Sequence, residues 1–258
     1  MKNTASSAFI LFVCFFLGIS VATAEVGDFP VEQRFLSVDF ELLTPINTDD
    51  DGVDLVYASP EQFAKLVNFD KIMVDQPEIW LDEDSDYRGV KPDNVKAIAD
   101  LIREVTIKRV SNRGYEVVEQ PGENTLYMRI ALTNLYLKKE KRGVLGYTPV
   151  GAVLKVGADA VRDMMSKVDI IEMALQTELS DSQTGEVLGA MVIKRGARKD
   201  KDAGQKEQRM DFDEFRDIVQ EYSARFACRL DNARKAEAQK VDCLDDAVLK
   251  AGGYFIED

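Results

Sequence analysis

The side chains available for chemistry in this chain of 258 residues are few, because histidine is absent and only three cysteines occur. Without histidine, the sequence lacks the usual general base near neutral pH and the commonest metal ligand. Catalytic triads that need histidine and two-histidine metal sites are therefore excluded. The sequence also contains no glycine-rich phosphate loop, dinucleotide-binding fingerprint or nucleophile elbow. It predicts no catalytic residue, no cofactor-binding residue and no metal ligand.

Two of the cysteines, Cys228 and Cys243, are candidates for a disulfide. A straight helix would hold them about 22 Å apart, whereas a disulfide needs Cα atoms about 4.4–6.8 Å apart. A bridge therefore requires the chain to turn back between Ala233 and Val241, and it would stabilise the fold by about 3 kcal/mol. The alternative is two separate thiols in a chain that meets little oxidant.

An acidic string at residues 47–54 resembles the start of a calcium loop, because Asn47, Asp49, Asp51 and Asp54 offer oxygen ligands around a glycine. The twelfth position of that loop is Ala58, where calcium loops carry a bidentate glutamate. The helices that flank such loops are also missing from the pattern. A solvated acidic loop is the favoured interpretation.

Other acidic residues fall in or near a predicted hairpin. Asp181, Thr184 and Glu186 could form a paired-acid site. Asp, Ser and Thr are also the residues that a tight turn selects, because their side chains bond to nearby backbone groups, and a turn is the favoured interpretation. Glu172 and Glu178 are six residues apart, hence about 20 Å along a strand. A glycosidase pair needs carboxyl groups about 5–9.5 Å apart, so these two cannot act together, although either could pair with an acid elsewhere.

The stretch from Gly143 to Leu154 contains no charged residue and three glycines. Exposed apolar patches mark sites for partners or ligands. This stretch is therefore the best candidate for a contact surface, and a buried linker between a strand and a helix is the alternative.

The elements that would position these residues follow from periodicity. Apolar residues recur every three or four positions over residues 92–112 and again from Asp211, which predicts two main helices. In the strand that begins at residue 126, the alternation changes parity at Thr133-Asn134, which predicts a β-bulge. Five strands are expected, at residues 70–81 with Pro77 interrupting, 115–119, 126–137, 171–179 and 187–193. These elements predict an α+β fold with one mixed or antiparallel sheet of about five strands packed against two main helices.

The start of the chain resembles an export signal. Lys2 precedes an apolar run over residues 9–19, and residues 22–24 read Ala-Thr-Ala, so cleavage is expected between Ala24 and Glu25. The run is shorter than the ~20 apolar residues of a membrane span. Removing residues 1–24 would take away one lysine and no acid, so the net charge would change from −13 to −14. Such acidity disfavours nucleic acid as a partner.

The expected organisation is a signal peptide at 1–24, an irregular lead-in at 25–68, a folded domain at 69–237 and a tail at 238–258. No transmembrane segment is expected in the mature chain. We expect a soluble periplasmic or secreted protein.

Five segments in order resemble the bacterial family DUF3313, whose function is unknown. They are Phe35-Leu36 with Asp39-Phe40, residues 70–75, residues 87–90, residues 120–122 with 126–133, and residues 178–188. The resemblance implies export by Gram-negative bacteria and no established catalytic residue. Many members look like envelope lipoproteins, but Cys14 lies inside the apolar run rather than at the cleavage point, so no lipid anchor is expected here.

These observations favour a non-catalytic cell-envelope protein that binds or organises a partner of unknown identity, with another envelope protein as a candidate. The alternative is a hydrolase or lyase that uses carboxylates without histidine, which predicts a cleft holding two acids in unequal environments. A module stabilised by calcium at residues 47–54 is the third hypothesis.

Overall fold

The computed structural model describes residues 31–49, 52–85, 90–139, 168–196 and 210–253. In this part of the chain, eight strands form one mixed sheet in the order β1-β2-β8-β7-β6-β3-β5, with β4 also paired to β6. The strands are β1 (Thr44–Asp49), β2 (Gly52–Tyr57), β3 (Lys71–Val74), β4 (Glu78–Leu81), β5 (Glu116–Val117), β6 (Thr125–Lys139), β7 (Val168–Asp181) and β8 (Val187–Gly196).

The described α-helices are α1 (Pro60–Lys65), α2 (Pro92–Ser111), α4 (Phe212–Ala233) and α5 (Asp246–Ala251). Short 3-10 turns are η1 (Phe40–Leu42), η2 (Leu66–Asn68) and η3 (Glu237–Gln239). The helix starts follow from their first residues: Ser59 caps α1, Pro92 is the first residue of α2, and Asp211 forms a capping box with Glu214 at α4. None of the described helices has the length and apolar character that crossing a membrane requires.

The expected sheet of about five strands is wrong in its count, although the α+β class holds. Pro77 divides residues 70–81 into β3 and β4, which both run parallel to β6. The β1–β2 hairpin lies in the segment expected to be an irregular lead-in and extends the sheet by pairing with β8. Its strands contain proline, asparagine and aspartate, which disfavour strands locally, so pairing with β8 decides their structure.

The β-bulge expected at Thr133-Asn134 is confirmed. The pairing register between β6 and β7 shifts between Thr133 and Tyr136. Asn134 has a φ of 51°, a conformation that asparagine tolerates better than most residues. The bulge returns apolar side chains to the core face beyond it, so Leu135 and Leu137 are buried.

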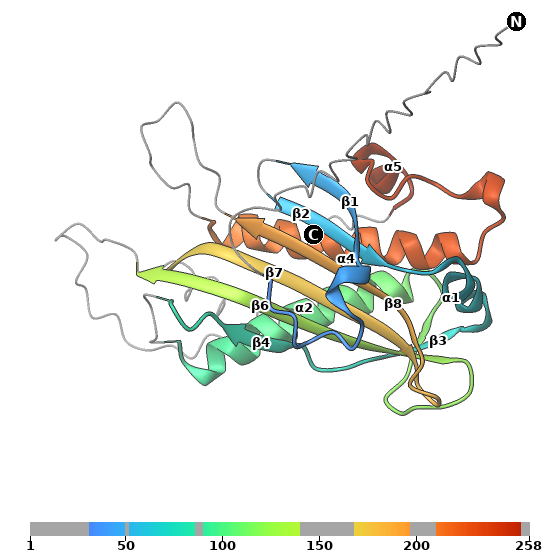
Figure 1. The fold of residues 1–258 in the computed structure, drawn as a ribbon, viewed down its shortest axis with the longest axis horizontal. Helices are drawn as coiled ribbons and strands as arrows, with labels where there is room; N and C mark the ends of the chain where they lie inside the picture. The colour runs from blue at the N-terminus through green and yellow to red at the C-terminus, as the bar shows by residue number, and fades with distance from the viewer. Residues whose placement is uncertain (1–30, 50–51, 86–89, 140–167, 197–209, 254–258) are drawn as a thin grey trace, which may run out of the picture.

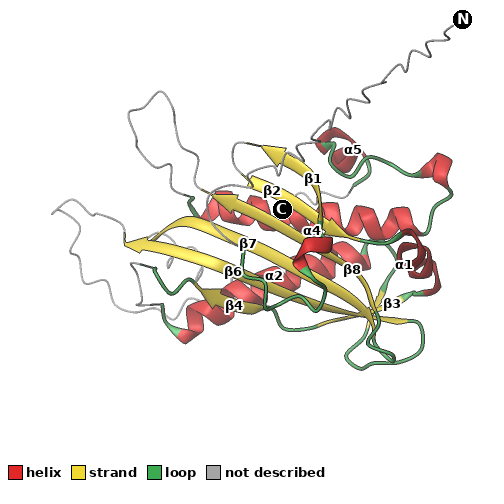
Figure 2. Ribbon diagram, viewed as in Figure 1, coloured by secondary structure: helices red, strands yellow, loops and turns green. Residues whose placement is uncertain are grey.

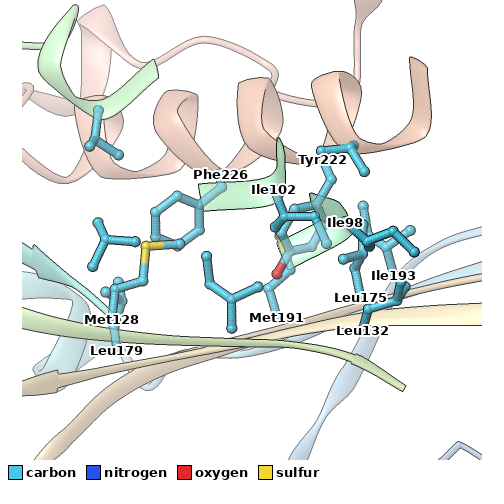
Figure 3. Close-up of a cluster of buried hydrophobic side chains, with 14 of the residues drawn as sticks. Ile98, Ile102, Met128, Leu132, Leu175, Leu179, Met191, Ile193, Tyr222 and Phe226 are labelled. Carbon is cyan, nitrogen blue, oxygen red and sulfur yellow. The ribbon is translucent and has the colours of Figure 1, made fainter. Parts of the chain in front are cut away.

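The main core lies between the sheet and helices α2 and α4, which cover one face (Figures 1 and 2). Figure 3 shows Tyr222 and Phe226 of α4 reaching from the helix towards the sheet. Their partners include Ile98 and Ile102 of α2 and, on the strands, Met128, Leu132, Leu175, Leu179, Met191 and Ile193. The apolar side chains that recur along the two helices therefore pack against one face of the sheet.

The opposite face of the sheet is crossed by residues 31–43, here called the N-terminal segment (Figure 1). Phe35 and Leu36 of this segment are buried against small side chains of the sheet, Ala131, Ala174 and Ala190. These alanines leave room for the segment to lie close to the strands. Both faces of the sheet are thus covered over its centre.

Candidate binding site

A pocket opens between α1, α4 and the start of β8, here called the α1–α4 pocket. Its volume is about 50 Å³. The sheet forms its floor, and Phe63, Leu66, Phe226 and Leu230 of the helical layer form its walls. Figure 3 shows three of its lining side chains, Leu179, Met191 and Phe226, in the main core. The remaining lining residues are Val56, Tyr57, Ala58, Thr177, Leu188, Gly189, Ala190 and Arg229.

The chain forms this pocket where β2 ends and α1 begins. Tyr57 pairs with Ala190 at the end of β2, and the Ser59 cap then turns the chain into α1. A Cβ on Gly189 would lie 3.4 Å from the carbonyl oxygen of Tyr57, which is an ordinary van der Waals contact. Ala58 is exposed at the mouth of the pocket.

Among the described residues that line the pocket, Arg229 alone is charged. Its Nη1 donates a hydrogen bond to Sδ of Met191 at 3.1 Å, and a thioether is a weak acceptor. Asp54 and Asp242 act on it only from farther away. Burial lowers the pKa of Arg229, but a guanidinium remains protonated in proteins. The pocket wall therefore carries a partly desolvated positive charge.

The floor of the pocket contains one polar contact. The hydroxyl of Tyr222 donates a hydrogen bond to Oγ1 of Thr177, and burial raises the pKa of Tyr222. Because both groups satisfy each other inside the core, the floor offers an apolar surface to a ligand. The pocket thus combines apolar walls with a single cation.

A buried ion network lies beside this site, between β2, β8 and α4. Asp54 is only 1% exposed and accepts hydrogen bonds from Arg195 at 2.8 Å and Arg225 at 2.7 Å. Arg225 also pairs with Glu221, whose pKa is raised by burial. The carboxylate of Asp54, the last acid of the calcium-like string, is therefore already paired with two arginines.

The calcium hypothesis finds no support in the part of the chain that the structure describes. No group of three or more potential metal-ligating residues occurs among these residues. Asp51 lies outside the described residues, and Asn47 and Asp49 lie on β1. Residues 47–49 and 52–57 form paired strands rather than the loop expected from the sequence.

The carboxylates of the predicted hairpin have separate structural roles. Asp181 accepts hydrogen bonds from the backbone N–H groups of Gln183 and Thr184, as a turn requires. Glu186 pairs with Lys65 of α1 at 2.7 Å. The backbone N–H of Asp181 donates to the carbonyl of Glu186 across the turn, but the two carboxylates contact different groups, so the paired-acid site gains no support.

Glu178 lies on the other face of the sheet, under the N-terminal segment. It accepts hydrogen bonds from the backbone N–H of Ser37 at 2.5 Å, from the Ser37 hydroxyl at 3.0 Å and from Arg129 at 3.2 Å. Arg129 also lies over the ring of Phe35. Glu172 is on the same strand, β7, where it lies opposite Tyr136 of β6 and Gly196 of β8 in the strand register.

Cys228 and Cys243 form a disulfide, with Cα atoms 5.8 Å apart. The chain turns back after α4, and Asn232 bonds through its side chain to both the carbonyl and the N–H of Val241. The predicted cleavage residues Ala24 and Glu25 and the stretch Gly143–Leu154 lie outside the described residues.

Sequence reasoning missed Arg229, although a signal for it exists. The apolar stripe of α4 contains Tyr222 and Phe226, and Arg229 follows seven and three residues later, on the same side of the helix. A cation on an apolar stripe indicates a special environment. Whether a carboxylate lies next to Arg229 depends on which segments pack around α4, and the sequence does not show this.

Comparison with known proteins finds one matching family. The family described as "Protein of unknown function (DUF3313)" matches residues 32–226. No curated protein matches the chain.

Among solved structures, a single-substitution variant of the PelC dodecamer from Paraburkholderia phytofirmans has 14% identity and a TM-score of 0.29, covering 55% of this chain and 78% of that one. The PelC dodecamer from the same organism in another crystal form has 12% identity and a TM-score of 0.30, covering 57% and 83%.

Proposed function

The chain belongs to the DUF3313 family of proteins of unknown function, and from that premise we propose that it is a non-catalytic bacterial cell-envelope protein that binds a partner through the α1–α4 pocket. The observation that carries the proposal is the combination of apolar walls with one desolvated cation, Arg229. Binding pockets commonly combine an apolar lining with a few placed polar groups.

The envelope location rests on the sequence and on the cysteine pair. Residues 1–24 have the pattern of an export signal. Cys228 and Cys243 are joined, and disulfides persist mainly in oxidising compartments outside the cytoplasm. We therefore place the mature chain in the periplasm or outside the cell.

The non-catalytic role is supported by how the buried acids are used. No carboxylate from the described ranges of the chain lines the α1–α4 pocket. Asp54 is paired with two arginines, and Glu178 is bound by Arg129 and Ser37. A hydrolase or lyase without histidine would need two acids facing a cleft, so the geometry favours binding.

Site-specific crosslinking with a blocked pocket tests this function. A photoreactive residue at Val67, which is 55% exposed and follows the pocket residue Leu66, is introduced into the chain expressed with its leader in a Gram-negative host. Ala58→Phe then places a bulky ring at the pocket mouth. Ala64→Phe is the matched control, because Ala64 is also exposed but does not line the pocket.

We expect a discrete crosslinked product that Ala58→Phe removes and Ala64→Phe leaves unchanged. Crosslinking that is equally strong with the pocket blocked would contradict the proposed binding site, and so would the absence of any product.

A further inference from the structure

The state of Arg229 indicates the charge of the group that the pocket receives. Its guanidinium has donors in a fixed fork that matches a carboxylate, yet its hydrogen bond within the described part of the chain goes to the thioether of Met191. No carboxylate of the described residues lies within ion-pair distance of it. An unpaired cation in apolar surroundings is costly, and an incoming anion would relieve that cost.

The size of the pocket limits the apolar part of the ligand. A volume of about 50 Å³ exceeds the roughly 10–15 Å³ that one water needs and is well below the ~150 Å³ of an apolar cavity that admits benzene. It therefore suits one small branched aliphatic group. The chain of a fatty acid is far too large for it.

We propose that the α1–α4 pocket receives the C-terminal residue of a partner protein, with a small aliphatic side chain in the apolar interior and the terminal carboxylate paired with Arg229. This inference rests on the proposed function and names the chemistry of the partner. In a C-terminal residue the side chain and the carboxylate share one Cα, so both reach the pocket together.

An internal residue of the partner fits less well. It would bring a backbone N–H and a C=O on either side of the side chain against walls that offer them no partners, and such burial is unfavourable. A terminal carboxylate instead forms charge-assisted, bidentate hydrogen bonds with arginine, which are among the strongest in proteins. The pocket should therefore bind a C-terminal residue of the partner more tightly than an internal residue.

The methyl group of Met191 provides the readout, because Met191 lines the pocket and contacts Arg229. Full-length protein labelled at methionine methyl carbons is titrated with an N-acetylated Gly-Gly-Gly-Val peptide in its free-acid form. The same peptide as a C-terminal amide and free isovalerate are the comparison probes. The methyl of Met73, on β3 away from the pocket, is the internal reference.

We expect the free-acid peptide to shift the Met191 resonance in a saturable manner and to leave Met73 unchanged. The amide should bind roughly tenfold more weakly or worse, because it loses the charge-assisted bonds. Arg229→Gln should weaken the binding of the free-acid peptide by a similar factor, so that this peptide binds no better than the amide. Arg229→Lys should recover part of the affinity, since it keeps the charge without the planar fork.

Other outcomes would overturn the inference in distinguishable ways. Equal binding of the acid and the amide would remove the role of the carboxylate while leaving the pocket as a binding site. Isovalerate binding as tightly as the peptide would assign the pocket to a free acid. No shift with any probe would reject the C-terminal ligand, and the Val67 crosslink would then decide separately whether the pocket binds a partner.

Discussion

Asp54 is a buried residue whose ion pairs connect β2 to β8 and α4. Asp54→Asn would remove the counter-ion of Arg195 and leave Arg225 with its remaining carboxylate partners, Glu221 and Asp246, and breaking a buried pair in this way costs about 3–5 kcal/mol. We expect a loss of that size in the free energy of unfolding, measured by urea denaturation. Glu104→Gln, at an exposed site on α2, should change it by no more than about 0.5 kcal/mol. Equal effects of the two changes would refute the role of Asp54.

Tyr127 links stability to alkaline pH. Burial and a hydrogen bond from its hydroxyl to Asp75 raise the pKa of Tyr127 to about 12, against about 10 for a free tyrosine. The folded state thus favours the neutral phenol. The contribution of the Tyr127 phenol to the free energy of unfolding is therefore complete below about pH 10 and is lost as the pH rises towards 12. We expect the stability difference between wild type and Tyr127→Phe to shrink over that interval in pH-dependent denaturation. A difference that stays constant would contradict the raised pKa.

The N-terminal segment is the element whose docking depends most on a single carboxylate. Glu178 holds Ser37, and the ring of Phe35 in the same segment packs edge-on against Trp80, the sole tryptophan of the chain. Removing the carboxylate with Glu178→Ala should loosen the segment by at least tenfold, since a hydrogen bond to a charged group contributes about 1.5–3 kcal/mol.

Tryptophan fluorescence and limited proteolysis measure this loosening. We expect a red-shifted emission from Trp80 and faster cleavage within residues 31–43 in Glu178→Ala. Glu186→Ala, which removes a partly exposed pair with Lys65, serves as the control and should behave as wild type. Unchanged emission and cleavage in Glu178→Ala would mean that apolar contacts alone hold the segment.

The whole molecule is proposed to work outside the cytoplasm with its cysteine pair oxidised. Intact mass spectrometry of the protein recovered from the envelope should show a chain that begins at Glu25. A thiol-alkylating reagent should add no mass before reduction and two groups after it, because only Cys228 and Cys243 remain once Cys14 is removed. Retention of Met1, or alkylation without reduction, would contradict export into an oxidising compartment.

Much of the architecture could be predicted from local patterns. The helical periodicity of residues 92–112, the start of α4 at Asp211 and the β-bulge at Thr133-Asn134 are all present in the structure. Such features depend on side chains a few residues apart, which the sequence displays directly. The disulfide between Cys228 and Cys243 is also present, at the pair of cysteines that the sequence offers as candidates.

The sequence by itself therefore determined the family, the α+β class and the main helices, and it named Cys228 and Cys243 as candidates for a disulfide. Only the tertiary structure decided that residues 44–57 form strands, that Asp54 is buried between two arginines, and that Arg229 faces an apolar pocket. The pairing of β2 with β8 and the burial of Asp54 depend on partners more than 100 residues away, and the state of Arg229 depends on the lack of a carboxylate partner among the described residues. Long-range pairing and desolvation arise only when distant segments meet, so no local pattern in the chain encodes them.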